Sequence, residues 1–352
     1  MESFTKRLGI QFPIIQAPMA GGLTTAELVA AVSNSGGLGS LGAAYMSADA
    51  IRKAIQQIRT LTDKPFAINL FIPNESYAAT EQIQNACHFI EQACKELNFK
   101  IVPSEPPYAI AFDEQMAVVI EEKIPVFSCI FGVLPKTWHT ELKNNKTIIM
   151  GTATNVAEAI LLEQSGVDMI IAQGSEAGGH RGSFLKNPED SLIGTFSLLP
   201  QLLDHLKLPV IAAGGIMEAR TIMAALTLGA SAVQMGTAFL ACTESGIHPS
   251  YKEALLATKQ DNTVLTTAFS GRLARGIRNK FIDRMEADKK NILPYPIQNA
   301  VTRAMRNEAA KQNCTDFMSM WAGQSAYLCE EMSVANLFSK LTTELNKIRP
   351  HS

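Results

Sequence analysis

The sequence predicts an α/β fold, a (β/α)8 TIM barrel with inserted helical and lid-like segments. Short apolar runs that end in glycine or a small polar residue recur along the chain, as expected for parallel strands that are buried on both faces. Helical stretches separate most of these runs. The 352 residues are enough for one barrel of ~250 residues with additional segments.

Eight apolar runs are expected to form the barrel strands, at residues 14–18, 38–42, 66–71, 126–130, 147–151, 168–173, 210–213 and 232–235. Stretches with helical periodicity lie between most of them, at residues 25–33, 48–59, 113–122, 155–164, 196–205 and 218–227. Glycine follows several of these stretches, at Gly36, Gly166 and Gly229, and glycine is the residue at which helices often end. The repeated unit is therefore one strand followed by one helix.

Two insertions break this repeat, at about residues 73–111 and at residues 241–299. Long excursions on the carboxyl side of barrel strands commonly form lids over a site, although a plain packing extension fits equally well. We therefore expect a cofactor-binding barrel over residues 1–240 that contains the first insertion. A lid-like insertion is expected over residues 241–299, and C-terminal helices over residues 300–352 are expected to complete the barrel.

The composition favours small-molecule chemistry. The formal net charge is −2, so no basic field points to nucleic acid. No apolar stretch approaches the ~18 residues of a membrane span, so a membrane is not an expected partner either. The six cysteines show no CxxC spacing, which predicts no metal site and a reducing, cytoplasmic setting. Assembly into a homo-oligomer is left open.

The stretch from Asp168 to Arg181, DMIIAQGSEAGGHR, reads as a buried strand followed by a loop at the catalytic rim of the barrel. His180 follows a glycine pair in this loop and is the strongest catalytic candidate, expected to titrate near neutral pH as a base. Glu176 either orients His180 or caps a local turn, and the sequence leaves these two roles open.

Glycines follow the last two predicted strands, in AAGGI around Gly215 and in QMGT around Gly236. Neighbouring loops of this kind hold phosphate groups in many barrels, because bare backbone amides converge there. Two carboxamides, Asn69 and Gln173, lie at the ends of other strands. The side-chain amide of each either forms hydrogen bonds within its own loop or forms hydrogen bonds to a ligand. Together the two amides would suit a heteroaromatic ring such as a flavin.

These motifs together resemble a known family. QAPM in the first strand, AINLF, AQGSEAGGHRG, PVIAAGGI and QMGTAF are similar to the nitronate monooxygenases, formerly called 2-nitropropane dioxygenases, of the histidine-containing bacterial and fungal class. The later FSGRLARGIRN and MWAGQ look like that family too, so the resemblance runs from about Gly9 to Gln324.

The resemblance implies an FMN-dependent enzyme that oxidises alkyl nitronates, such as propionate 3-nitronate, and also nitroalkanes with O2. The products would be a carbonyl compound and nitrite, and no metal would be needed. The catalytic histidine of the family falls on His180, which would abstract a proton from nitroalkanes and position nitronates. The positions implied to contact FMN are Asn69, Gln173, Gly178, Gly215, Gln234, Met235, Gly236 and Thr237.

The main alternative is an NAD(P)H-dependent FMN reductase of the enoyl-acyl-carrier-protein reductase or quinone reductase type, which resembles this barrel. A barrel of the inosine-monophosphate dehydrogenase type would need a nucleophilic cysteine in the loop after the sixth strand, and residues 174–182 contain none. A flavin-binding module without turnover is disfavoured by the histidine at the rim.

Overall fold

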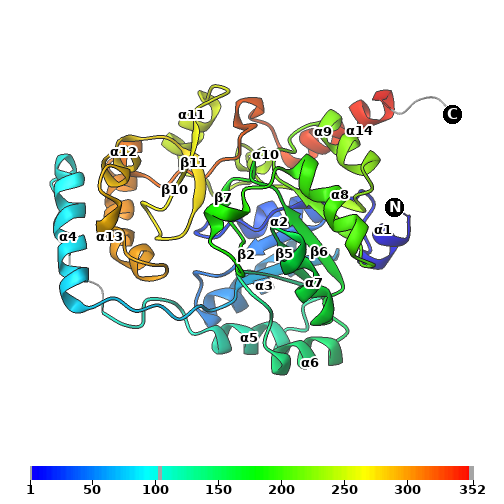
Figure 1. Ribbon diagram of the computed structural model, residues 1–352. Helices are drawn as coiled ribbons and strands as arrows, with labels where there is room; N and C mark the ends of the chain where they lie inside the picture. Colours follow the sequence, from blue (N-terminus) through cyan, green and yellow to red (C-terminus); the bar gives the residue numbers. More distant parts are fainter. Residues whose placement is uncertain (1, 102–104, 349–352) are drawn as a thin grey trace.

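The computed structural model describes residues 2–101 and 105–348, and it confirms the predicted (β/α)8 barrel (Figure 1). Neighbouring strands follow the order β1-β9-β8-β6-β5-β4-β3-β2, all parallel. A parallel bridge between Ile15 and Leu38 joins the two outer strands and closes the barrel. The strands are β1 (Ile14–Gln16), β2 (Gly39–Gly42), β3 (Phe66–Phe71), β4 (Val126–Ile130), β5 (Ile148–Ala153), β6 (Met169–Gln173), β8 (Val210–Ala213) and β9 (Ala232–Met235), each overlapping a predicted run.

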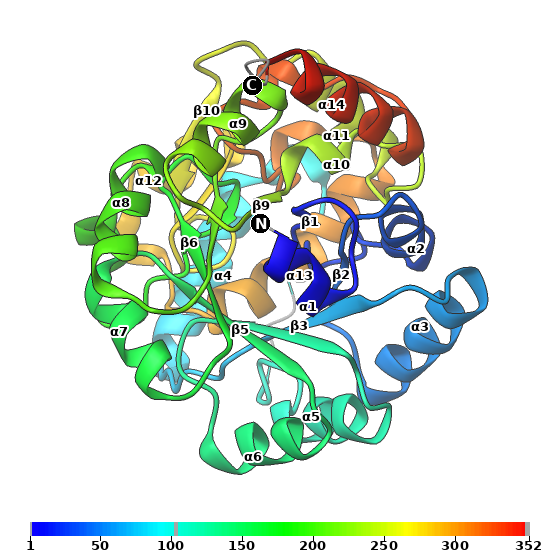
Figure 2. The same ribbon diagram turned by 90° about the vertical axis from the view of Figure 1, so that its right-hand side faces the viewer.

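A ring of helices surrounds the strands, as Figure 2 shows along the barrel. The predicted helices are present as α2 (Ala26–Asn34), α3 (Ala48–Leu61), α5 (Phe112–Glu121), α7 (Val156–Gln164), α8 (Thr195–His205) and α9 (Ala219–Thr227). The sequence did not indicate α6 (Lys136–Asn144), because Leu142 is its one buried residue and no apolar periodicity marks it. The last helix, α14 (Val334–Ile348), packs against α2 and α9 and completes the ring.

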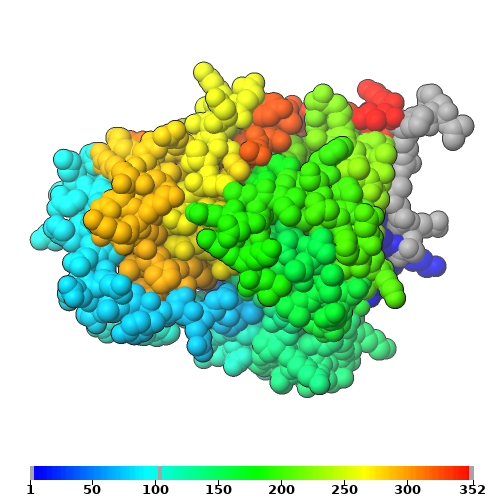
Figure 3. Space-filling model, viewed as in Figure 1, coloured from blue at the N-terminus to red at the C-terminus, as the bar shows by residue number. Residues whose placement is uncertain are grey.

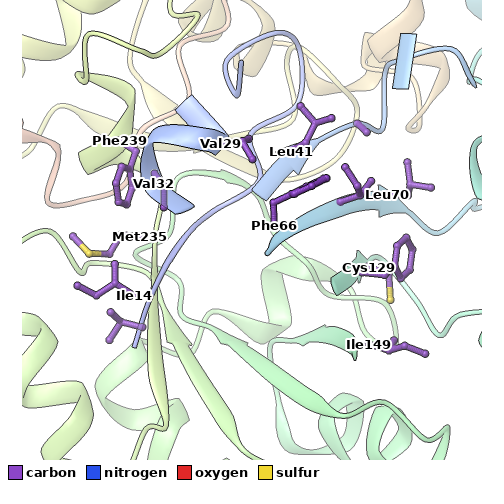
Figure 4. Packing of buried hydrophobic residues seen from close by; sticks show 14 of the residues in the cluster. Ile14, Val29, Val32, Leu41, Phe66, Leu70, Cys129, Ile149, Met235 and Phe239 are labelled. Atoms are coloured by element: carbon purple, nitrogen blue, oxygen red, sulfur yellow. The ribbon is translucent and has the colours of Figure 1, made fainter. Parts of the chain in front are cut away.

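The main core lies between the strands and the helices (Figure 4). Ile14 and Met235 contribute from strands, and Val32 contributes from α2. A separate cluster closes the amino-terminal end of the barrel, where Phe4 and Leu8 of α1 (Glu2–Leu8) pack on inward-facing strand residues. Figure 2 shows α1 lying across this end. The opposite, carboxyl end of the strands is therefore the end left for a ligand.

A second hydrophobic cluster lies beyond the carboxyl ends of the strands, and we call the segments that form it the cap (residues 79–101 and 241–329). It forms the cyan and orange lobe in Figures 1 and 3. The cap contains an antiparallel hairpin of β10 (Thr263–Thr266) and β11 (Ala274–Ile277). Its helices are α4 (Thr80–Ala93), α11 (Pro249–Leu256), α12 (Lys280–Glu286) and α13 (Ile297–Lys311).

The two insertions thus share one hydrophobic core although they lie far apart in the sequence. Since α13 packs within this core and α14 packs on the barrel, we propose that α13 belongs to the cap and α14 to the barrel.

The plug formed by α1 can be tested by Phe4→Ala. Phe4 is 4% exposed in the cluster at the barrel end, so its removal leaves a cavity, and we expect a loss of about 3 kcal/mol in the free energy of unfolding. Thermal or denaturant unfolding measures this loss, with Lys6→Ala on the exposed side of the same helix as the control. Equal unfolding midpoints for the two variants would contradict the plug.

Candidate active site

A cavity of about 1210 Å³, counting the part open to solvent, lies at the carboxyl ends of the strands and is covered by cap residues. Met235 does not line it, because its side chain is fully buried in the main core (Figure 4). The structure brings the other expected site residues together around the cavity: Asn69, Gln173, Gly178, His180, Gly215, Gln234, Gly236 and Thr237.

The cap holds His180 in place by strand pairing. Gly179 and His180 form the short strand β7 (Gly179–His180), which pairs with β11 antiparallel, so that His180 lies opposite Ala274. Gly179 has φ +76°, a conformation that favours glycine. From the barrel side, Gln173 donates from Nε2 to the His180 carbonyl at 3.0 Å and accepts from the Gly182 amide at 2.7 Å. The Gln173 side chain therefore forms its hydrogen bonds within the loop that carries His180.

A buried serine that the sequence reasoning missed fixes the imidazole. His180 Nε2 lies 2.8 Å from Ser270 Oγ. The Ser270 hydroxyl donates its proton to the Arg272 carbonyl at 3.0 Å and accepts from the Arg272 amide at 3.2 Å. A serine hydroxyl has one proton, and with that proton on the Arg272 carbonyl the His180 proton lies on Nε2. Nδ1 is then the nitrogen with a free lone pair.

The expectation that His180 titrates near neutral pH is wrong for this form of the protein. Burial, reinforced by the positive charges of Arg272 and Arg306, lowers the pKa of His180 to about 3. The imidazole is therefore neutral at physiological pH and is a weak base. Burial is the larger cause, and the charges of Arg272 and Arg306 add to it.

The two charged neighbours of His180 in the sequence serve the loop. The Glu176 carboxylate accepts from the amide of Thr195 at 2.8 Å and from its hydroxyl at 2.9 Å, so it caps the start of α8 and does not orient His180. Arg181 is buried and donates to the carbonyls of Gln173 and Ser191. Both residues therefore stabilise the conformation of the loop that carries His180.

The glycine loops after β8 and β9 face the cavity side by side. Gly215 has φ +72°, and within the described residues neither its amide nor that of Gly236 donates a hydrogen bond. The cap covers both loops: Ser325 Oγ donates to the Gly215 carbonyl at 3.2 Å, and the Gly323 amide donates to Thr237 Oγ1 at 3.0 Å. Two free amides in a covered pocket suit an anionic group such as phosphate.

Asn69 is buried in β3 and lines the same cavity. Its Nδ2 donates to the Ser128 carbonyl at 3.1 Å and to the Ser128 hydroxyl at 2.9 Å. This fixes the orientation of the amide and leaves Oδ1 free as an acceptor toward a ligand.

Aromatic rings that the sequence reasoning did not identify surround His180. The ring centroids nearest to it belong to Trp321, Phe131, Tyr295 and Phe71, at 5.4, 6.0, 6.0 and 6.3 Å. Trp321 and Phe71 lie in MWAGQ and AINLF, two segments that resemble the family, so this resemblance could have identified them as site residues. Phe131 carries no such signal, and it is held at φ +78°, an unusual conformation for an aromatic residue.

Within residues 2–101 and 105–348, no group of three or more His, Cys, Asp or Glu side chains could hold a metal ion. In the same part of the chain, no helix is long and apolar enough to span a membrane. The described site thus offers free amides, carboxamides, aromatic rings and one neutral imidazole.

Comparisons with known proteins agree with this site. The nitronate monooxygenase family model matches residues 2–344. A probable nitronate monooxygenase of Staphylococcus haemolyticus is 44% identical over 350 residues, which cover 98% of this chain and 97% of the relative. The structure of a nitroalkane oxidase from Streptomyces ansochromogenes is similar with a TM-score of 0.91 and 36% identity, covering 99% of each chain. FabK from Thermotoga maritima is similar with a TM-score of 0.77 and 32% identity, covering 98% of this chain and 96% of that one.

The family match spans nearly the whole chain, and the motifs that carry it line the cavity. On this evidence, the chain is an oxidoreductase that belongs to the nitronate monooxygenase family.

Proposed function

We propose that this chain binds FMN and oxidises alkyl nitronates, such as propionate 3-nitronate, with O2, giving a carbonyl compound and nitrite. The observation that carries this proposal is a neutral His180 within reach of the positive charges of Arg272 and Arg306. A nitronate is an anion, so this environment stabilises it without a proton transfer. Neutral nitroalkanes are the poorer substrates in this proposal, because they require a stronger base.

The cavity fits FMN by its chemistry. The free amides of Gly215 and Gly236 would hold the phosphate group, with Thr237 beside them. The side-chain amides of Asn69 and Gln234 would form hydrogen bonds to the flavin ring. Gly178, which has no side chain, would let the ring approach the backbone. When bound, FMN supplies the oxidising ring, and the protein controls the position of the substrate and its access to O2.

His180 would position the substrate, and its free lone pair would accept the proton of a neutral nitroalkane. Ser270 holds the ring by Nε2, which leaves Nδ1 free to accept a hydrogen bond or a proton from a ligand. The surrounding aromatic rings exclude water, so the electrostatic interactions in the site are stronger than in solution. The described cysteines are all unpaired, which supports a reducing, cytoplasmic setting as part of the proposal.

The proposed function is tested first by reduction of the bound flavin without oxygen. We expect propionate 3-nitronate to bleach the flavin absorbance, and nitrite to form when air is admitted. NADH and NADPH, added to a parallel sample, should leave the spectrum unchanged over the same time. Bleaching by the nicotinamide alone would instead support the NAD(P)H-dependent reductase.

The phosphate site is tested by Gly215→Val. Valine at φ +72° is strained, and its Cβ would approach Glu176 Cβ at 3.3 Å, so the loop cannot keep its conformation. We expect the purified variant to lose most of its FMN, measured as the ratio of flavin to protein absorbance. The matched control is Gly21→Ala, at a positive-φ glycine with open space around it. Stoichiometric FMN in the valine variant would refute the assignment.

The role of His180 is tested by His180→Asn. We expect FMN to stay bound, nitroalkane turnover to fall by at least ~10²-fold and nitronate turnover to fall much less, because only the nitroalkane needs a base. Equal losses on both substrates would count against this division of roles.

The same variant tests the ionisation of His180. Because the folded-state pKa is about 3 and the ordinary value is 6.5, the unfolded chain binds the proton first as the pH falls. The wild-type protein should therefore lose stability relative to the variant between pH 6.5 and 3. Unfolding midpoints measured across this range check the sign, and a gain of relative stability would contradict it.

A further inference from the structure

The turn that carries Ser270 is held in place from outside the cavity. It joins β10 to β11 and spans residues 267–273, and we call it the hairpin turn. From this turn Ser270 reaches His180, with 2.8 Å between Oγ and Nε2. A small displacement of the hairpin turn would therefore change the contact that holds the imidazole. The groups that fix the turn thus bear on the position of His180.

Two side chains of α13 bind the two carbonyls that directly precede Ser270. Gln298 Nε2 donates to the Ala268 carbonyl at 2.8 Å. The Thr302 hydroxyl donates to the Phe269 carbonyl at 2.5 Å. Both side chains are 0% exposed, and they lie one helical turn apart on the same face of α13. This face of α13 therefore holds the hairpin turn at two consecutive residues.

The polar pair lies in an apolar part of the cap core. Ile297, Val301 and Met305 of the same helix belong to that core and are also buried. A polar side chain in such surroundings is costly unless it is hydrogen-bonded. The Thr302 hydroxyl lies 3.5 Å from the Asn299 carbonyl of its own helix, which is a weaker contact than its bond to the hairpin turn. The turn is therefore its main partner.

Gln298 also connects the hairpin turn to the segment packed against it. Its Oε1 accepts from the Leu293 amide at 3.1 Å, while its Nε2 donates to the turn. Gly271, next to Ser270, packs so closely on this segment that an added Cβ would lie 2.1 Å from the Leu293 carbonyl oxygen. One carboxamide thus holds both sides of a tight contact. The position of Ser270 is fixed by this contact and by the bonds from α13.

We propose that Gln298 and Thr302 are positioning residues for His180 and act on it through Ser270. The inference rests on the proposed function, in which Nδ1 of His180 accepts the proton of a neutral nitroalkane. Because the two side chains hold the hairpin turn, they hold the Ser270 hydroxyl against Nε2 and so orient Nδ1 toward the substrate. Neither side chain is among the described residues that line the cavity, so neither would touch the substrate itself.

The first test is Thr302→Val, which keeps the shape of the side chain and removes its hydroxyl. Nitroethane and its anion, ethylnitronate, are compared by their kcat/KM values in the FMN-bound enzyme. We expect the nitroethane-to-nitronate ratio to fall by roughly 10-fold, because only nitroethane depends on the placement of Nδ1. Thr302→Ser restores a hydroxyl and should return the ratio to within about 2-fold of wild type. A ratio unchanged in Thr302→Val would overturn the inference.

The matched control is Thr258→Val. Thr258 is also a buried threonine of the cap, and its hydroxyl donates to the Ala254 carbonyl of α11 at 2.8 Å. We expect both valine variants to lower the midpoint of thermal unfolding, but only Thr302→Val to change the substrate ratio. An equal fall of the ratio in both variants would show a general loosening of the cap and contradict the inference. If Thr302→Val does not fold, Gln298→Met takes its place with the same expected result.

A double-mutant cycle tests whether the effect passes through Ser270. Ser270→Ala should lower the substrate ratio by itself. If Thr302 acts only through Ser270, adding Thr302→Val to Ser270→Ala should change the ratio by less than about 2-fold. A full additional fall in the double variant would show that Thr302 acts by another route.

A measurement without turnover separates this inference from the proposed function. The carbon-bound Hε1 proton of the His180 ring is followed by NMR in the holoenzyme and identified by its absence in His180→Asn. We expect its signal to move in Ser270→Ala and in the same direction in Thr302→Val, but to stay in place in Thr258→Val. If the signal moves in this way but wild type oxidises neither substrate, the proposed function fails and the positioning of His180 stands. If wild type oxidises both substrates and the signal stays in place in Thr302→Val, the inference alone fails.

Discussion

The short antiparallel pairing of β7 with β11 is the interaction on which the site depends. It joins the barrel loop that carries His180 to the hairpin of the cap, and it sets His180 opposite Ala274. Ser270 lies in the turn of that hairpin. The hairpin therefore holds both the imidazole of His180, through Ser270, and the backbone of His180, through β11. A change in the position of the cap would therefore move both the backbone and the imidazole of His180.

The cap also explains why a histidine at the barrel rim is neutral. Without the cap, His180 would lie in an open barrel mouth and would titrate near its ordinary pKa. With the cap, Trp321 and Tyr295 exclude water from the ring, while Arg272 and Arg306 add positive charge. One structural unit thus weakens His180 as a base and brings positive charge near it, and under the proposed function both effects would favour an anionic substrate.

Much of the barrel could be predicted from the sequence, because strands buried on both faces leave a local signal in the form of short apolar runs bounded by glycine. The His180 loop and the glycine loops could be located for the same reason, since each follows such a run directly. Met235 was included by resemblance, but in the strand its side chain alternates into the core while Gln234 faces the cavity.

The remaining part of the site depends on contacts between distant segments, which a single sequence does not record. Ser270 meets His180 across 90 positions, and α13 meets the first insertion through a shared core. The expected pKa of His180 was wrong for this reason, because its neighbours in the sequence, Glu176 and Arg181, turn away from the ring. The residues that set its charge come from the cap.

Phe131 shows how the barrel and the cap are matched to each other. Its positive φ turns the chain at the end of β4, and its ring then lies under the Arg272 guanidinium and beside Tyr295. A bulky residue held in this conformation costs on the order of 1–3 kcal/mol, which only the surrounding packing can offset. This packing lies where the aromatic rings, the cap and the loop that carries His180 meet. The packing that offsets this strain therefore holds the Phe131 ring in place beside His180, where a substrate would bind.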